Sequence, residues 1–467
     1  MKNAIHYIFG ILGVLLLIIS CQEKTEPIQI VNLRCENRVD PLGIDNLHPK
    51  FSWNLTSEFR NKKQTAYQIL ISDSKENLDN NNGNYWDSKK IKSDRSIQVA
   101  YQGKNLTSEL LVYWKIRIWD EKGKVSEWSE PAQFEMGLLD LKVWQGQWIS
   151  DGKREPENLK EFYETDPAPY FRKPFTLDKK VKKARLYITG IGYYEASING
   201  LKIGDHVLDP GWTNYDKRIL YSTYDVTDKI VKGGNCIGVE LGNGWYNPLP
   251  MLMFGGFNLR EDLPVGRPKF IAQLHIEYTD GSKEKIISDK HWKTHEGPIQ
   301  RNNIFLGEIY DARKEIKDWN LASFDDIAWA QAKEIEKKGV RLQAQNQPPI
   351  KIKEQVNPIK VTEIEPDVFI FDMGENFAGW VKLKINADAG TSITLRYGEL
   401  INKDGSLNPM TSVAGQVKGR KKDNTLKGGP SSPEIAWQSD TYIAKGEGVA
   451  YYQPKFTFHA FRYVEVS

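Results

Sequence analysis

Two short glycine-containing segments place a tryptophan beside amide side chains, a combination that suits a carbohydrate-binding surface. Residues 209–215 (Asp-Pro-Gly-Trp-Thr-Asn-Tyr) contain Trp212, and residues 241–246 (Leu-Gly-Asn-Gly-Trp-Tyr) contain Trp245. A pyranose offers its C–H face to an aromatic ring and its hydroxyls to fixed amide or carboxylate groups. The acid, the amides and the backbone carbonyls of these segments also suit Ca²⁺, which prefers oxygen ligands. The alternative is that both tryptophans are core residues that lie beneath loops.

No other pattern in the sequence indicates a metal centre, a nucleotide site or a nucleic-acid surface. The 467 residues carry a formal net charge of +3, with lysine and arginine spread evenly along the chain. This spacing leaves no basic patch, so we expect no nucleic-acid partner. Phosphate-binding and dinucleotide-binding motifs and metal-spaced Cys/His groups are absent from the sequence. After Cys21 only Cys35 and Cys236 remain, and we expect two free buried thiols.

The elements that carry the two tryptophans are predicted to be β-strands, because short alternating segments recur and long helical periodicity is nearly absent. The predicted fold class is therefore all-β, with sandwiches in tandem. Residues 28–139 contain about seven short strands, which predicts an immunoglobulin-like or fibronectin-like sandwich. Residues 144–335 form a second module, in which Asn199-Gly200 predicts a tight turn. Residues 345–467 form a third sandwich.

The N-terminus has the features of a bacterial lipoprotein signal peptide. A short basic start precedes the apolar residues 4–19, which are too few for a membrane span, and Ser-Cys follows them. We predict a signal peptide over residues 1–21, lipidation at Cys21 and a tether over residues 22–27. The lipid would anchor an exported protein without spanning the bilayer. We expect it at the outer membrane of a Gram-negative bacterium, on the periplasmic side or the cell surface; the alternative is a buried thiol or a one-span anchor.

The last residues, 456–467, form an alternating aromatic and β-branched run that is typical of a core strand. No polar tail or turn follows this run, although termini are usually loose and exposed to solvent. We expect from this pattern that the third sandwich is interrupted and that the catalytic part of the protein lies beyond Ser467.

Six motifs resemble those of bacterial α-L-rhamnosidases of the inverting glycoside hydrolase family 78 type. They occur in the family's order and cover nearly all of the chain after the tether. The motifs are residues 194–200 (Tyr-Glu-Ala-Ser-Ile-Asn-Gly), 208–215 (Leu-Asp-Pro-Gly-Trp-Thr-Asn-Tyr), 307–313 (Gly-Glu-Ile-Tyr-Asp-Ala-Arg), 371–380 (Phe-Asp-Met-Gly-Glu-Asn-Phe-Ala-Gly-Trp), 439–442 (Ser-Asp-Thr-Tyr) and 461–465 (Phe-Arg-Tyr-Val-Glu).

The resemblance implies a fibronectin-like domain, a jelly-roll domain at residues 144–335 and a concanavalin-like sandwich at residues 345–467. In the family, an (α/α)₆ barrel with the two catalytic carboxylates and a closing β-domain follow. Inverting geometry separates the two carboxyls by roughly 6.5–9.5 Å, which leaves room for a water molecule. No long helical run follows Val381, so we expect the barrel to be absent from this chain and assign no catalytic residue.

A carboxylate pair within the chain, Glu308 with Asp311, is the alternative source of catalysis. Both residues belong to the motif at residues 307–313, which also contains Arg313. This arrangement favours a structural turn in which Arg313 neutralises an acid, rather than a catalytic pair.

In some relatives the jelly-roll domain is a rhamnose-binding module that uses calcium. The resemblance implies Asn214 as the metal ligand, although Thr213 stands where a calcium-binding version is expected to have an acid. The alternative is a structural domain with no sugar site. The substrate-binding residues that the resemblance implies are Trp212, Asn214, Tyr215, Asn243 and Trp245.

Three functions remain open at this point. The chain is the N-terminal part of an α-L-rhamnosidase whose gene is split or truncated, or a free-standing carbohydrate-binding lipoprotein. The third alternative is a relic or an assembly partner of a separately encoded catalytic barrel. The expected partners are glycans that contain L-rhamnose and, through the lipid, a bacterial membrane.

Overall fold

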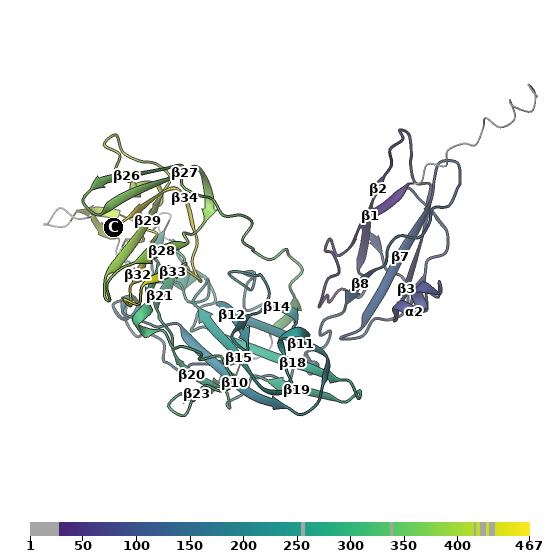
Figure 1. Ribbon diagram of the computed structural model, residues 1–467, viewed down its shortest axis with the longest axis horizontal. Coiled ribbons are helices and arrows are strands. Elements are labelled where there is room, and N and C mark those ends of the chain that lie inside the picture. Colours follow the sequence, from purple (N-terminus) through teal and green to yellow (C-terminus); the bar gives the residue numbers. More distant parts are fainter. Residues whose placement is uncertain (1–27, 254–256, 337–339, 415–416, 421–425, 429–434) are drawn as a thin grey trace, which may run out of the picture. The chain divides into compact units, whose positions relative to one another are not determined.

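The computed structural model (Figure 1) describes residues 28–253, 257–336, 340–414, 417–420, 426–428 and 435–467. The chain divides into two compact units, one up to Met136 and one from Gly137 to Ser467. Both consist of β-sheets with a few short helices, which confirms the predicted all-β class. Cys35 and Cys236 are free and buried, as expected.

The first unit is a sandwich of short strands. One sheet has the order β1 (Gln29–Cys35), β2 (Lys50–Thr56) and β6 (Val99–Ala100). The other has the order β4 (Trp86–Asp87), β3 (Ala66–Ser72), β7 (Leu111–Trp119) and β8 (Ala132–Glu135), and β5 (Ile91–Lys92) also pairs with β3. Helix α2 (Lys75–Asp79) follows β3 in the chain. Phe51 of the first sheet packs on Trp114 and Phe134 of the second, at centroid distances of 4.7 and 5.8 Å. The inward positions of the alternating strands therefore form one aromatic core.

The second unit begins with a larger sandwich whose two sheets enclose an extensive apolar core. One sheet has the order β13 (Leu201–Lys202), β12 (Tyr193–Ile198), β15 (Gly233–Gly242), β10 (Pro169–Leu177), β20 (Lys293–Glu296) and β23 (Ala330–Gln331). The other has the order β24 (Lys333–Glu334), β9 (Ile149–Ser150), β18 (Lys269–Tyr278), β11 (Val181–Ile191), β14 (Arg218–Asp225) and β25 (Arg341–Ala344), with β19 (Lys283–Ile287) also paired with β18.

Two glycines set the path of the chain through this sandwich. Gly192 joins β11 to β12 and so carries the chain from one sheet to the other; its φ is 102° and a Cβ would lie 2.4 Å from the Gly242 carbonyl oxygen. Only glycine fits such a position. Asn199 and Gly200 (φ 50° and 83°) connect β12 to β13, with Ile198 paired to Leu201. This geometry confirms the tight turn predicted from the Asn-Gly pair.

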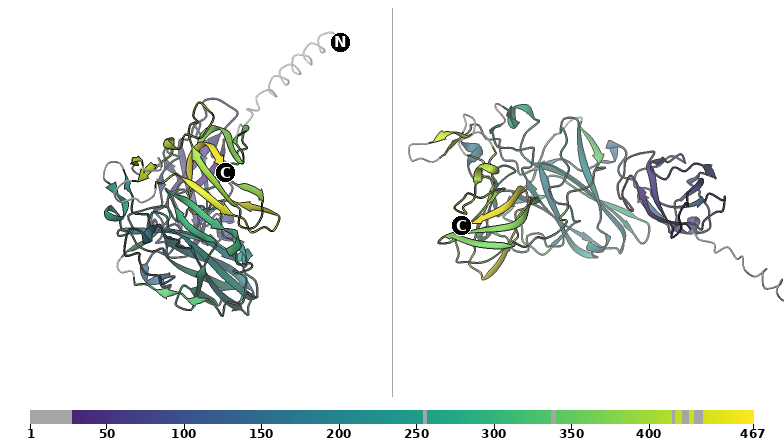
Figure 2. Two further views of the ribbon diagram at one scale, coloured as in Figure 1. Left: turned by 90° about the vertical axis from the view of Figure 1, so that its left-hand side faces the viewer. Right: turned by 90° about the horizontal axis from the view of Figure 1, so that it is seen from above.

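The third sandwich draws strands from both sides of the predicted boundary between the second and third modules. Strands β21 (Ile299–Asn303) and β22 (Gly307–Asp311) come from the segment assigned to the second module, yet they pair into this sheet. Strand β34 (His459–Val466) lies between two other strands of the sheet and leads to the C-terminus marked in Figure 2. A two-stranded ladder, β28 (Leu383–Asn386) with β33 (Val449–Tyr452), packs with it. The sheet order is β21 (Ile299–Asn303), β22 (Gly307–Asp311), β32 (Ser439–Ile443), β29 (Ser392–Gly398), β34 (His459–Val466), β27 (Val368–Gly379) and β26 (Lys360–Glu365).

The remaining described elements are short. Within the described ranges, no helix combines the length and the apolar character needed to cross a membrane. The short elements are the ladders β16 (Leu252–Met253) with β17 (Phe257–Asn258) and β30 (Val417–Arg420) with β31 (Leu426–Gly428), helix α3 (Leu259–Asp262), and the 3₁₀ turns η1 (Leu141–Val143), η2 (Glu161–Tyr163), η3 (Thr227–Lys229), η4 (Ala312–Lys314) and η5 (Pro409–Thr411).

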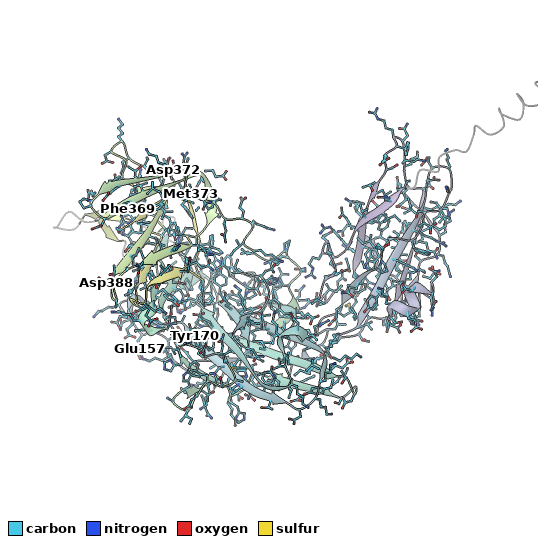
Figure 3. The ribbon with its side chains drawn as sticks, viewed as in Figure 1. Glu157, Tyr170, Phe369, Asp372, Met373 and Asp388 are labelled. Carbon is cyan, nitrogen blue, oxygen red and sulfur yellow. The ribbon has the colours of Figure 1, made fainter. Side chains whose placement is uncertain are left out.

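Motifs that are far apart in the sequence lie on neighbouring strands of the third sandwich. Strand β27 pairs with β34, so residues 371–380 lie beside residues 461–465. The Arg462 guanidinium donates to both carboxylate oxygens of Asp372, at 2.8 and 2.9 Å; Figure 3 labels Asp372 in β27. The register shifts after Asp372, where Gly374 has a φ of 89°. These two motifs therefore form one structural unit.

Candidate carbohydrate-binding surface

The two predicted tryptophans stack on each other, but only one is exposed. Trp212 lies in the loop between β13 and β14, and Trp245 lies in the loop after β15. Their ring centroids are 4.7 Å apart and the planes are inclined by 17°. Trp245 also meets Phe305 edge-on at 5.8 Å and packs against buried apolar residues, whereas Trp212 is 45% exposed. Trp245 therefore supports the ring of Trp212, which offers the available aromatic surface.

The loop of Trp212 is anchored by the buried carboxylate of Asp209. Its Oδ2 accepts hydrogen bonds from the hydroxyls of Tyr194 (2.6 Å) and Ser222 (2.7 Å), and its Oδ1 accepts one from Gln345 Nε2 (3.1 Å). Burial raises the pKa of Asp209, but the hydrogen bond and charge of nearby His206 and the hydroxyl donors outweigh it and leave the pKa below its ordinary value. The first residue of the motif at 209–215 is thus structural.

Asn214, two residues after Trp212, is exposed, whereas Tyr215 is buried. The Oδ1 of Asn214 accepts the backbone N–H of Asp216 at 3.0 Å, and no partner for its Nδ2 is found among the described residues. Tyr215 is 1% exposed and packs edge-on against Tyr246, with centroids 5.4 Å apart. The structure therefore places Tyr215 in the core beneath the loop, where a ligand on the surface would not contact it.

Asn243 is committed to contacts within the protein. Its backbone N–H and its Nδ2 donate to the Oδ1 and the carbonyl oxygen of Asn302, at 2.7 and 2.8 Å. Its Oδ1 accepts from Asn247 Nδ2 at 2.9 Å. Of the five residues predicted to bind substrate, the structure therefore brings Trp212 and Trp245 together, leaves Asn214 exposed and turns Asn243 and Tyr215 inward.

Comparisons with known proteins assign the three sandwiches in order. Residues 30–140 match the family described as the Rha78A-like N-terminal immunoglobulin domain, and residues 179–354 match the α-L-rhamnosidase N-terminal domain. Residues 362–467 match the bacterial α-L-rhamnosidase concanavalin-like domain. The chain belongs to the bacterial α-L-rhamnosidase family. The resemblance inferred from the six motifs is thereby confirmed.

Individual α-L-rhamnosidases match nearly the whole chain, but the chain spans only about half of each. One from Formosa agariphila is 34% identical in an alignment that covers 98% of this chain and 48% of that protein. A solved structure from Dictyoglumus thermophilum has a TM-score of 0.80 at 40% identity and covers 94% of this chain and 46% of its own. The Streptomyces avermitilis enzyme, solved with L-rhamnose, has a TM-score of 0.78 at 27% identity. This match covers 94% of the present chain and 56% of the Streptomyces chain.

In this rhamnosidase-family chain, Glu308 and Asp311 serve different structural roles. They are three positions apart in β22, so they point to opposite faces of the sheet. Asp311 accepts two hydrogen bonds from the Arg313 guanidinium, at 2.9 and 2.8 Å, which confirms the expected salt-bridged turn. Glu308 is fully buried. The two carboxylates therefore do not face a shared space.

Glu308 belongs to a buried polar cluster that sequence reasoning missed. Asp440 Oδ1 accepts the Glu308 backbone N–H (2.9 Å), and its Oδ2 accepts the Tyr397 hydroxyl (2.6 Å) and lies 3.1 Å from His459 Nε2. Burial, and then the charge of Asp440, raise the pKa of Glu308 to about 8. One signal in the sequence could have indicated this cluster: its polar residues stand at positions of alternating strands where the side chain is expected to point into the core.

Lys455 links the third sandwich to the six-stranded sheet of the jelly-roll domain. Its Nζ lies 2.5 Å from Glu240 Oε2 and 3.6 Å from Glu195 Oε1. Both glutamates belong to that sheet, on β15 and β12. Burial lowers the pKa of Lys455, but these two carboxylates outweigh it and hold the pKa well above its ordinary value. The pairing compensates the charge of Glu240, which is buried, while the Lys455 side chain is partly exposed between the two sheets.

The oxygen atoms at Asn214 do not fit a calcium ion in this conformation. Ca²⁺ takes roughly six to eight oxygen ligands, but the Asn214 carbonyl oxygen already accepts the N–H groups of Lys217 and Arg218, and Thr213 Oγ1 donates to the Arg218 carbonyl. Across the described residues no group of three or more His, Cys, Asp or Glu side chains could hold a metal. Calcium binding stays a prediction, and so does lipidation, because Cys21 lies outside the described residues.

Proposed function

We propose that this chain supplies the β-domain scaffold of an α-L-rhamnosidase and contacts rhamnose with the exposed side of Trp212. The complete enzyme would hydrolyse terminal α-L-rhamnosyl linkages in plant or bacterial glycans. The order of the three matched domains carries the proposal, because proteins with this order are named α-L-rhamnosidases, and one was solved with L-rhamnose.

The charged residues of the motifs support a scaffold role. Asp209, Asp372 and Asp440 are each held by hydrogen bonds from other parts of the same unit. A general acid and a general base must instead reach a substrate and a water molecule from opposite sides. We therefore propose that the catalytic carboxylates are supplied by a barrel outside this chain, encoded with it or separately.

The exposed ring of Trp212 supports the proposed sugar contact. One of its faces is covered by Trp245, which leaves the opposite face for the C–H surface of a pyranose. The Asn214 amide lies two residues further along the same exposed loop and can donate to a hydroxyl. This surface needs no metal, so we expect L-rhamnose to bind equally with and without Ca²⁺.

Two measurements on the purified chain test the proposal. We expect no release of aglycone from an aryl α-L-rhamnoside, and turnover by this chain would contradict the scaffold role. In calorimetry, L-rhamnose is expected to bind weakly, and Trp212→Ala is expected to lower the binding heat. Phe59→Ala, which removes another exposed ring, from the first unit, is the matched control. No binding heat at millimolar sugar, with or without Ca²⁺, would refute the Trp212 surface.

A second candidate function is a free-standing carbohydrate-binding lipoprotein without catalysis. The Ser-Cys end of the predicted signal peptide, at Cys21, favours it. In this case the chain would hold rhamnose-containing glycans at the outer membrane. Mass spectrometry of the exported protein would show a lipidated N-terminal cysteine, and translation of the DNA after codon 467 would show no helical barrel. A barrel in any frame would favour the first function or a separately encoded partner.

A further inference from the structure

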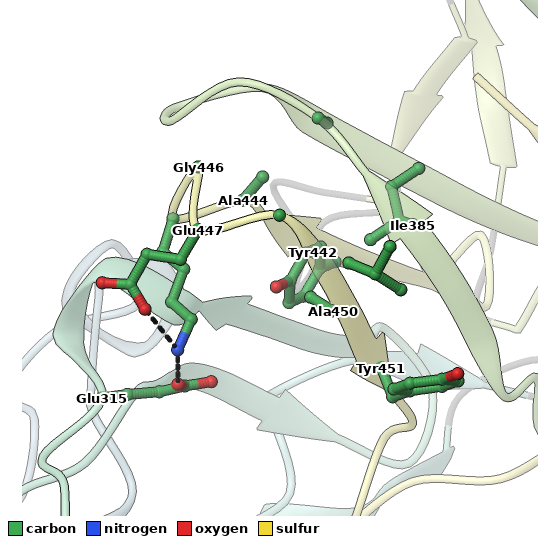
Figure 4. A pocket seen from close by; sticks show the side chains of 12 residues that line it. Glu315, Ile385, Tyr442, Ala444, Gly446, Glu447, Ala450 and Tyr451 are labelled. Atoms are coloured by element: carbon green, nitrogen blue, oxygen red, sulfur yellow. Dashed lines mark hydrogen bonds and ion pairs between the residues drawn. The ribbon is translucent and has the colours of Figure 1, made fainter.

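A cavity of about 220 Å³ lies at the turn between β32 and β33, on elements other than those that carry Trp212 (Figure 4). The turn contains two glycines with φ of 80°, Gly446 and Gly448, which let the chain reverse tightly over the opening. The other walls come from β28 and from Glu315, which follows β22. None of these residues belongs to the proposed rhamnose contact.

One wall of the cavity is a charged cluster made of Glu315, Lys445 and Glu447. The Lys445 Nζ lies 2.9 Å from Glu315 and 3.1 Å from Glu447. Tyr310 also donates its hydroxyl to Glu315 Oε1 at 2.9 Å. Each carboxylate can accept several hydrogen bonds, so both retain capacity for a ligand hydroxyl. The two carboxylates and one ammonium leave a net negative charge, which disfavours an anionic ligand.

Tyr442 presents an unused hydroxyl to the same cavity. The residue is 2% exposed, and its ring stacks between Tyr310 and Tyr452, with centroids 6.0 and 5.1 Å away. No hydrogen-bond partner for its Oη is found in the described part of the chain, although the side chain lines the cavity, between the charged cluster and Tyr451 (Figure 4). An unpaired hydroxyl that lines a cavity can bond to water or to a ligand hydroxyl.

The opposite wall is apolar. Ile385 and Ala450 are paired neighbours on β28 and β33, so their side chains lie side by side on one face of the ladder. Both line the cavity together with Ala387. Tyr451, which is 64% exposed, stands at the rim. An apolar wall opposite a few fixed polar groups is the usual composition of a site for a small organic ligand.

We propose that this cavity binds one pyranose ring of a neutral glycan, with hydroxyls on Tyr442 and the charged cluster and the C–H face against Ile385. The volume is below the roughly 300–1,000 Å³ of sites for drug-sized ligands, so it suits one ring rather than an oligosaccharide. An acidic sugar is disfavoured because Lys445 is already neutralised by two carboxylates. The site would let the scaffold hold a glycan at a second point, which raises its effective concentration.

Titration calorimetry and saturation-transfer NMR with methyl α-L-rhamnopyranoside test the site, and the choice of probe rests on the proposed function. The experiment uses the full chain with Trp212→Ala, so that only the cavity is read. Tyr442→Phe in this background removes one hydroxyl that bonds to no described residue, and we expect affinity to fall at least about fivefold. Tyr113→Phe, in the first unit, is the matched control.

Each outcome decides between the alternatives. Affinity that is unchanged by Tyr442→Phe, or no binding to the Trp212→Ala protein while the unmodified chain binds, overturns the cavity and leaves the Trp212 surface intact. Binding lost with Tyr442→Phe but retained with Trp212→Ala supports the cavity and overturns the Trp212 surface as the sole contact. Tighter binding of D-glucuronate than of the neutral glycoside overturns the ligand class. If Tyr442→Phe unfolds, Glu447→Ala, at a 72% exposed side chain, gives the same reading.

Discussion

Replacement of Glu308 by glutamine should stabilise the protein at neutral pH and leave its stability at acidic pH nearly unchanged. The buried carboxyl accepts the backbone N–H groups of Lys455 and Phe456 on Oε2, at 3.1 and 3.4 Å. A glutamine carbonyl oxygen can accept the same bonds. The Tyr452 hydroxyl lies 3.3 Å from Oε1, where the glutamine Nε2 can donate to it instead. The substitution therefore keeps these contacts and removes the ionisable group.

The expected size of the effect follows from the pKa of Glu308, which burial and Asp440 raise from 4.5 to about 8. Between these two values the folded chain keeps a proton that the unfolded chain has released, so stability falls as pH rises. Each pH unit in this window costs about 1.4 kcal/mol. Between pH 4.5 and pH 7 the wild-type chain should therefore lose about 3 kcal/mol relative to Glu308→Gln.

Urea unfolding of both proteins at several pH values between 4.5 and 8 measures this difference. Groups that do not contact Glu308 contribute equally to both proteins and cancel in the comparison. Glu375→Gln, an exposed position in the same sandwich, controls for the change in net charge. A difference between wild type and Glu308→Gln that is the same at pH 5 and pH 7.5 would refute a protonated Glu308 in the folded chain.

Two further substitutions test the packing at the motifs. Gly307→Ala should destabilise the protein by more than about 2 kcal/mol in urea unfolding, because its Cβ would lie 2.1 Å from the Ser439 carbonyl oxygen. Gly281→Ala is the control, because Gly281 has a similar positive φ but open space around it. An equal loss of stability in both variants would mean that the backbone conformation, and not the contact with Ser439, causes the effect. Trp212→Ala should lower the free energy of unfolding by only about 1–2 kcal/mol, since it removes one stacked pair with Trp245 from a 45% exposed position. A decrease above about 4 kcal/mol would mean that Trp212 is a core residue and not a binding surface.

Local rules were enough to predict the strands and the Asn199-Gly200 turn, because both depend on residues that are adjacent in the sequence. The sheets were beyond such rules. Strand β22 leaves the segment of the jelly-roll domain and pairs in parallel with β32, so that Glu308 lies beside Asp440, 132 positions later. No periodicity within either segment encodes this partnership, which results from the packing of whole domains.

The candidate site shows the same limit. Trp212 and Tyr215 are three residues apart in one loop, and their side chains are both aromatic, yet one is 45% exposed and the other 1%. The difference comes from distant partners: Tyr246 covers Tyr215, whereas Trp245 covers only one face of Trp212. The cavity at Tyr442 left no local pattern either, because Glu315 reaches it from more than a hundred residues earlier in the chain.

The position of the motif residues explains why the family of this chain is easier to establish than its activity. Gly307 and Ser439 are in close contact, Asp372 bonds to Arg462, and Asp209 holds the loop of Trp212. Each of these contacts joins segments whose relative position defines the rhamnosidase scaffold. Residues fixed by such contacts identify the family wherever the scaffold occurs, whether or not a catalytic barrel accompanies it. A test of ligand binding must therefore address residues that these described contacts leave free, such as Trp212 with Asn214 on one loop and the Tyr442 hydroxyl in the cavity.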